Sequence, residues 1–127
     1  MNVVDSSAWL EYFAGGPNAP FFAEAIEDRT RLLVPAIVVW EVHRRLLQLQ
    51  RTDSEAVLVA SVLTSGRVVD LDSALAISAA RLGVRHRIPL ADSIVLATAR
   101  RYSATVWTQD ADFETLEGVR YRPHRSS

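Results

Sequence analysis

The sequence of 127 residues contains neither cysteine nor lysine. Without cysteine the chain can form no disulfide bond and no thiolate zinc site. All 14 basic residues are arginine, so mechanisms that need a catalytic lysine are excluded. The three histidines, His43, His86 and His124, lie far apart in the sequence and form no recognisable pair of metal ligands. These absences leave carboxylates as the most obvious reactive groups.

Long apolar segments are absent as well. No hydrophobic run approaches the roughly 20 residues that a membrane-spanning helix needs. Asp5 and Glu11 interrupt the apolar start of the chain, and no basic segment of the kind found in signal peptides precedes it. The composition, with 49% hydrophobic and 23% charged residues, is globular. We therefore expect a cytoplasmic protein without a membrane partner, folded as a single domain over residues 1–127.

Short apolar strands alternate with helices along the chain. Several of the expected helices begin at a Ser, Thr or Asp cap or at a proline. This alternation predicts a parallel sheet covered by helices on both faces. The expected fold class is α/β, a three-layer α/β/α sandwich with a mostly parallel sheet of four to five strands. The expected strands cover residues 2–5, 32–34, 67–71, 105–108 and, at an edge of the sheet, 119–122. The expected helices cover residues 6–14, 19–28, 36–51, 54–63, 73–82, 89–102 and 111–116.

Acidic side chains fall at positions that this fold would bring together. In open α/β sheets, sites form in the crevice beyond the carboxyl ends of the strands. Asp5 ends the first expected strand, and Asp110 follows the strand that ends at Thr108. Asp92 lies in the first turn of a helix, and Glu41 lies among apolar residues of the long third helix. Four acids that are distant in sequence can therefore meet at one rim.

Each of these acids also has a purely structural explanation. Asp5 and Asp110 could cap helices through their side chains, and Asp92 could interact with a helix dipole. Glu41 is followed by Arg44 and Arg45, so a surface ion pair would account for it. The set is more informative than its members, because crowded carboxylates repel and raise one another's pKa, so a fold keeps such a cluster for a reason.

A hard divalent cation would supply that reason. Mg²⁺ and Mn²⁺ prefer oxygen ligands and tolerate bound waters. Such an ion suits phosphodiester hydrolysis, because it lowers the pKa of a bound water and offsets the charge that grows on the phosphate. We predict one or two ions. The predicted ligands, direct or through water, are Asp5, Asp92 and Asp110, with Asp112 as an auxiliary ligand. Glu41 would be a further ligand or would position the attacking water, and Ser6 and Thr108 would support the site by hydrogen bonds.

Three segments carry a family resemblance. They are the opening Val-Val-Asp-Ser-Ser at 3–7, the segment Pro-Leu-Ala-Asp-Ser-Ile-Val-Leu-Ala-Thr-Ala at 89–99, and Thr-Gln-Asp-Ala-Asp-Phe at 108–113. Together with the helical Glu41, they resemble PIN-domain ribonucleases, most of all the VapC toxins of type II toxin–antitoxin pairs. The resemblance spans nearly the whole chain in order. Its one small departure is Trp107, where a smaller strand residue is usual.

The resemblance implies a Mg²⁺- or Mn²⁺-dependent endoribonuclease that cuts a structured cellular RNA and arrests translation. The four family acids correspond to Asp5, Glu41, Asp92 and Asp110, and the family Ser/Thr positions correspond to Ser6 and Thr108. It also implies a homodimer that is silenced by a cognate antitoxin. The antitoxin would occupy the active-site groove and would provide the only contact with DNA.

Arginines and aromatic residues near the acids are candidates for RNA contacts. Arg44 and Arg45 lie close to Glu41 in the sequence, and Arg85 and Arg87 precede Asp92. A solvated helix face is the alternative for each of these arginines. Trp9 and Tyr12 could stack on bases, although burial in the core or at an interface is the more usual role of aromatics at helical spacing.

Two other functions are compatible with a strand-end acid cluster. A receiver or haloacid-dehalogenase-like phosphoacceptor domain also places Asp at strand ends with Mg²⁺, but these families employ a lysine that this chain lacks. A PIN-like binding module would hold RNA or a protein without cutting it. RNA cleavage that disappears in folded Asp5→Asn and Asp92→Asn variants would distinguish an enzyme from such a module.

Overall fold

The computed structural model describes residues 1–126. It contains five strands, each three or four residues long, which are β1 (Asn2–Val4), β2 (Leu32–Pro35), β3 (Arg67–Val69), β4 (Thr105–Thr108) and β5 (Val119–Tyr121). The α-helices are α1 (Ser6–Ala14), α2 (Ala19–Ile26), α3 (Ala36–Gln48), α4 (Asp53–Thr64), α5 (Ser73–His86) and α6 (Leu90–Arg101). Two short 3₁₀ helices, η1 (Arg29–Arg31) and η2 (Ala111–Phe113), precede β2 and follow β4.

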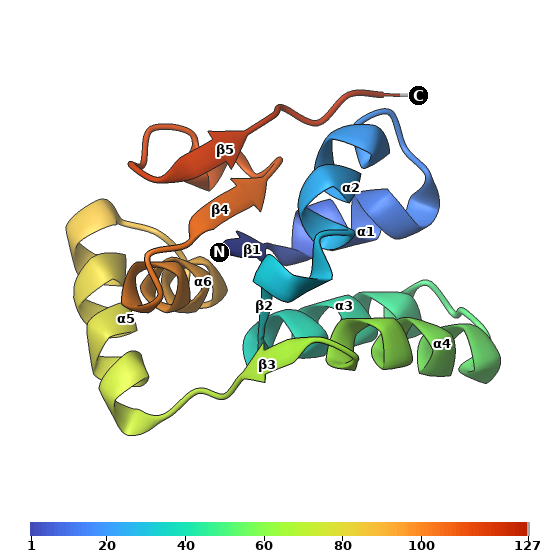
Figure 1. Ribbon diagram of the computed structural model, residues 1–127, viewed down its shortest axis with the longest axis horizontal. Helices are drawn as coiled ribbons and strands as arrows, with labels where there is room; N and C mark the ends of the chain where they lie inside the picture. The colour runs from blue at the N-terminus through green and yellow to red at the C-terminus, as the bar shows by residue number, and fades with distance from the viewer. Residues whose placement is uncertain (127) are drawn as a thin grey trace.

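The five strands form one parallel sheet in the order β3-β2-β1-β4-β5 (Figure 1). Every connection between neighbouring strands is a crossover, as parallel strands require. β1 lies in the middle and pairs with β2 through Val3 and Leu33 and with β4 through Val4 and Trp107. The expected parallel sheet and its fifth strand at the edge are therefore confirmed.

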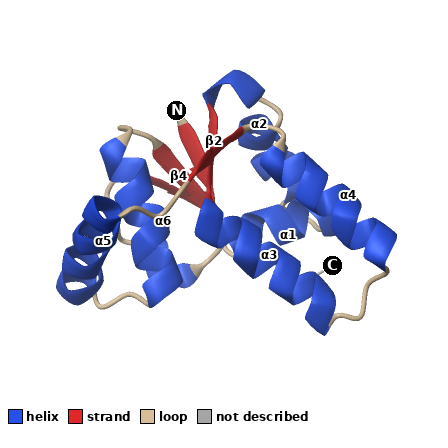
Figure 2. Cartoon of the chain, turned by 90° about the horizontal axis from the view of Figure 1, so that it is seen from below, coloured by secondary structure: helices blue, strands red, loops and turns tan. Residues whose placement is uncertain are grey.

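Helices cover both faces of the sheet, which confirms the α/β/α arrangement. α1 and α2 pack on one face, against β1 and β4, and α6 packs on the other face, with α5 outside it. α3 contacts both α1 and α6, and α4 packs against α3. Figure 2 shows α5 and α6 on one side of the strands and α1, α3 and α4 on the other.

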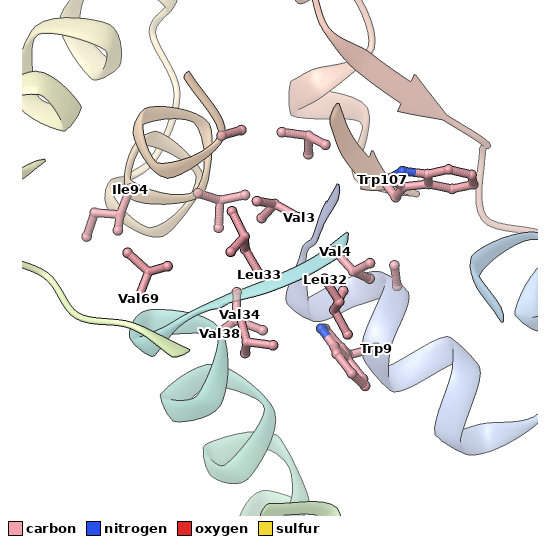
Figure 3. Packing of buried hydrophobic residues seen from close by; sticks show 14 of the residues in the cluster. Val3, Val4, Trp9, Leu32, Leu33, Val34, Val38, Val69, Ile94 and Trp107 are labelled. Carbon is pink, nitrogen blue, oxygen red and sulfur yellow. The ribbon is translucent and has the colours of Figure 1, made fainter. Parts of the chain in front are cut away.

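The core follows the two-residue alternation of the strands. Val3 and Leu33 point toward α6, whereas Val4 and Leu32 point to the opposite side, where Trp9 of α1 lies (Figure 3). All five side chains are at least 95% buried. Because both faces are covered, the central strands β1, β2 and β4 place apolar side chains on both faces instead of alternating between polar and apolar residues.

Four expected helix boundaries were wrong, and one of them is the end of the third helix, expected at residue 51 and found at Gln48. The helix expected to end near Leu82 continues through Gly83 to His86 and ends at Arg87, which adopts the left-handed conformation. Gly83 does not stop the helix. It allows close packing on α6, because a Cβ there would lie 3.3 Å from the Ser93 Cβ. The second helix stops at Ile26, and the expected helix at 111–116 is only the 3₁₀ turn η2. Within residues 1–126, no helix has the length and apolar character needed to cross a membrane.

Candidate active site

The sheet topology brings the ends of β1 and β4 together. Because these strands are parallel neighbours, Asp5 and Asp110 leave the sheet at the same edge, and the Asp5 amide continues the ladder by donating to the Trp107 carbonyl at 3.1 Å. The first turn of α6 carries Asp92. Glu41 lies on α3, which packs against both α1 and α6.

Asp5 is held rigidly. Its side chain is only 3% exposed. One carboxylate oxygen accepts from the Ser7 hydroxyl at 2.8 Å and the Ala8 amide at 3.1 Å, and the other accepts from the Thr108 hydroxyl at 2.7 Å. Burial raises the pKa of Asp5 to about 6, although these hydrogen bonds oppose the rise. Asp5 therefore caps α1, as the structural explanation expected, and also faces the acidic edge.

Asp92, Asp110 and Asp112 form the tightest acidic group. Each offers a carboxylate oxygen within 4.8 Å of the others. The Asp110 side chain caps η2 by accepting from the Asp112 amide at 2.9 Å, and the Asp110 amide donates to the Thr108 hydroxyl at 2.9 Å. Burial and then the Asp110 charge raise the pKa of Asp92 to about 8, with further contributions from Asp112 and Asp5. The structure therefore places repelling carboxylates where a cation would relieve them.

Glu41 is half-buried and hydrogen-bonded to α1. The Ser6 hydroxyl donates to its carboxylate at 3.0 Å. Burial and the Asp110 charge raise its pKa. Among the described residues, Glu41 forms no ion pair with an arginine; Arg44 instead lies over the Trp40 ring, 5.4 Å from its centre. The ion-pair explanation of Glu41 is therefore wrong.

Asp110 lies close enough to three other acids of the site to affect each of them. Its charge raises the pKa of Asp5, Asp92 and Glu41, which come from three different elements. The sequence-predicted acids are thus brought to one region, with Asp5 and Glu41 beside the tighter group of three. Such an arrangement offers several oxygen ligands to a divalent cation, and neighbouring hydroxyls or amides fix those of Asp5, Glu41 and Asp110.

The profile of the PIN domain family matches residues 3–119. The chain belongs to the PIN-domain family. Its membership removes the phosphoacceptor alternative. The fold of this PIN domain is similar to that of Mycobacterium tuberculosis VapC20, a toxin described as cleaving the sarcin–ricin loop, at 22% identity and a TM-score of 0.78 over 97% of this chain and 100% of that one. No curated protein sequence matches the chain.

Two further solved structures share the fold of this PIN domain. A toxin–antitoxin complex from Klebsiella pneumoniae is 20% identical, with a TM-score of 0.75 over 94% of this chain and 96% of that one. FitAcB from Neisseria gonorrhoeae is 23% identical, with a TM-score of 0.73 over 97% of this chain and 98% of that one.

Two features of the site were missed from the sequence. Ser7, next to the expected Ser6, hydrogen-bonds Asp5, and the Asp-Ser-Ser motif after a strand could have suggested both contacts. Gln109, beside Asp110, accepts at 3.1 Å from the side chain of buried Asn18, which also donates to the Pro123 carbonyl at 2.9 Å. Nothing in the local sequence links residues 18 and 109.

The candidate RNA-contact residues lie in different places. Arg44 and Arg45 line a shallow pocket of about 200 Å³ together with Ser6 and Glu41. Arg85 lies instead in a groove between α5 and α6, and Arg87 is the exposed residue that ends α5. Trp9 is buried in the core, and Tyr12 donates to Glu27 at 2.9 Å, so the burial explanation holds for Trp9.

Proposed function

We propose that this PIN domain is a metal-dependent endoribonuclease and the toxin of a toxin–antitoxin pair. The observation that carries the proposal is the convergence of Asp5, Glu41 and Asp92 around Asp110. A binding module would gain nothing from carboxylates crowded at one edge, since they repel phosphate as well as one another.

The donor set fits Mg²⁺ or Mn²⁺. The oxygens of Asp92, Asp110 and Asp112 are close enough to share an ion, and Asp5 would bind through water or through its remaining lone pairs. When bound, one or two such ions would lower the pKa of a water and offset charge on the scissile phosphate.

The residues of the chain would then hold the reacting groups in place. Glu41, fixed by Ser6, would orient the attacking water and accept its proton, for which its raised pKa suits it. Thr108 forms hydrogen bonds with both the Asp5 side chain and the Asp110 amide. It would therefore hold these two acids in a fixed position relative to each other.

Asp110→Asn is the sharpest test, because asparagine is as good a helix cap as aspartate and should preserve η2. Wild-type protein with Mn²⁺ should cleave structured cellular RNA, and the variant should lose nearly all of that activity while remaining folded. The matched control is Asp70→Asn, at an exposed acid beyond β3. Metal-loaded wild-type protein that binds RNA tightly without cutting it would show a binding module instead.

The antitoxin is the proposed protein partner, and contact with DNA would come only through it. The pocket beside Glu41 shares Leu10 and Arg45 with a groove of about 370 Å³ between α1, α3 and α4. Its walls include Phe13, Leu46 and Leu58, which suit an amphipathic helix. A partner bound in this groove could extend into the adjoining pocket and contact Glu41, the nearest acid of the site. Leu58→Asp should weaken binding of a co-expressed antitoxin.

The homodimer stays a prediction. α5 exposes Ile77 by 57% and Val84 by 82%, two apolar side chains about two turns apart on one helix face. A second copy packed there would bury both and would have to leave the neighbouring Arg81 and Arg85 exposed on the side of α5 that faces α6. Size-exclusion chromatography with light scattering should give a dimer for the wild type and a monomer for Val84→Asp.

A further inference from the structure

A groove lined by arginines lies between α5 and α6, outside the acidic site. It has a volume of about 380 Å³. Figure 2 shows the two helices side by side on one flank of the molecule. Four arginines line the groove, two from each helix: Arg81, Arg85, Arg100 and Arg101. Its floor consists of small or apolar side chains such as Leu75 and Ala97.

Little negative charge offsets these arginines. Arg101 forms a two-point ion pair with Asp72, at 3.0 and 3.1 Å. Arg100 donates to the Glu117 carbonyl at 3.4 Å, a neutral group. In the part of the chain that the structure describes, Arg81 and Arg85 have no acidic partner. Since all four arginines are exposed, the groove offers at least two guanidinium groups to an anion.

The groove is lined by α6 residues from Ala97 onward, toward the end of α6 that lies away from Asp92. α5 runs back along α6, with Gly83 packed against Ser93, one residue after Asp92. Arg85 follows Gly83, whereas Arg100 and Arg101 lie at the far end of α6, about 12 Å along the helix from Asp92 at 1.5 Å per residue. The arginines therefore lie along one flank of the molecule, with Arg85 on the part of α5 that packs near the start of α6 and with Arg100 and Arg101 at the end of α6.

We propose that this groove binds the phosphate backbone of the RNA substrate away from the cleaved bond. The inference rests on the proposed function for its substrate. The planar guanidinium group matches phosphate oxygens with paired hydrogen bonds. An acidic protein segment is less well suited, because half of the residues that line this groove are arginines, whereas the groove between α1, α3 and α4 offers the larger set of apolar anchors on which protein interfaces rely.

The test measures binding of a fluorescein-labelled single-stranded RNA of 20 nucleotides by fluorescence anisotropy, in Mg²⁺ and in an uncleaving Asp92→Asn background. Arg81→Gln/Arg85→Gln should weaken binding about tenfold and reduce the slope of log K against log salt by about 1.4, or 0.7 for each lost phosphate contact. The control, Arg29→Gln/Arg31→Gln in η1, removes the same charge elsewhere and should bind like the parent. Arg81→Lys/Arg85→Lys should recover most of the salt slope.

Cleavage supplies a second measurement. In the otherwise wild-type protein, Arg81→Gln/Arg85→Gln should lower kcat/KM for a long RNA more than for a dinucleotide, because the dinucleotide is too short to reach from the acids to the groove.

Three outcomes would overturn the inference. They are unchanged RNA affinity and salt slope in Arg81→Gln/Arg85→Gln, an equal loss in the η1 control, and polyglutamate that competes as well as RNA, which would point to an acidic protein partner. If the arginine variant loses RNA binding but the wild type cleaves no RNA with Mg²⁺ or Mn²⁺, the nuclease proposal fails. The proposal that the groove binds RNA is then still supported.

Discussion

The hydroxyl of Thr108 donates to Asp5 at 2.7 Å and at the same time accepts from the amide of Asp110 at 2.9 Å. One side chain at the end of β4 therefore fixes two acids that are more than a hundred residues apart. Its hydrogen bond also lowers the pKa of Asp5, against the larger effect of burial.

Thr108→Val should keep the shape of this residue and remove both hydrogen bonds. We expect the pKa of Asp5 to rise further above 6, so the acidic limb of the pH–rate profile for RNA cleavage should move to higher pH. The loss of a buried hydrogen-bond partner should also destabilise the fold by about 1–3 kcal/mol. Thr108→Ser should restore the pH profile; a Thr108→Val profile that matches the wild type would contradict this role.

The stability of the metal-free protein should fall as pH rises. Between its ordinary pKa of 3.8 and its folded pKa of about 8, Asp92 keeps a proton in the folded state that the unfolded chain has lost. The folded state thus binds more protons, and its stability decreases with pH through this window and levels off above it. Asp5 contributes in the same direction, only up to about pH 6.

Asp92→Asn isolates the contribution of Asp92. In EDTA, the melting temperature of the wild type should fall from pH 6 to pH 8, and that of Asp92→Asn should fall less. The variant should also be the more stable protein at pH 8, because the amide relieves the repulsion from Asp110. Asp70→Asn should follow the wild type. A strongly destabilised Asp92→Asn protein would show that this residue serves the helix and not the site.

Mn²⁺ should stabilise the folded protein at neutral pH. A cation that binds the folded state alone adds about 2.7 kcal/mol at a concentration of one hundred times its Kd. Affinity should increase with pH as Asp92 loses its proton. Thermal unfolding with and without MnCl₂ measures this shift, which Asp110→Asn should largely abolish. Equal stabilisation of wild type and variant would place the ion elsewhere.

Glu11 allows a prediction of protein stability that does not depend on the acidic site. Its side chain is 7% exposed and accepts from the Asn18 amide at 2.8 Å, and its carboxylate fills the space in which a side chain on Gly16 would lie. Glu11→Ala should destabilise the protein by about 1–3 kcal/mol, because it leaves a buried amide without a partner. Urea unfolding measures this loss, with exposed Glu24→Ala as the control. An unaltered free energy of unfolding would show that water replaces the carboxylate.

The sequence predicted those features that depend on local pattern and on topology. Apolar strands that stop at an acid or a polar residue were enough to predict a parallel sheet and to place Asp5 and Asp110 at the same edge. Asp92 and Glu41 could be added because each lies on a helix that borders that edge.

Contacts that depend on tertiary packing could not be predicted in this way. The end of α5 was misplaced because glycine usually ends a helix, whereas Gly83 here allows α5 to approach α6 closely. Arg85 was expected near Asp92 because the two residues are close in the sequence. In the structure it lines the groove between α5 and α6 together with Arg100 and Arg101. The link from Asn18 to Gln109 spans 91 positions and follows from no local signal.

The position of β4 in the sheet also matters during synthesis. β1, made first, has no partner on its β4 side until residues 105–108 leave the ribosome, and Asp110 follows only then. A growing chain that carries Asp5, Glu41 and Asp92 therefore still lacks the acid that all three of them face. On the proposed function, the cell would meet a competent nuclease only after residues 105–110 had been translated, which leaves time for an inhibitor made beforehand to bind the emerging chain.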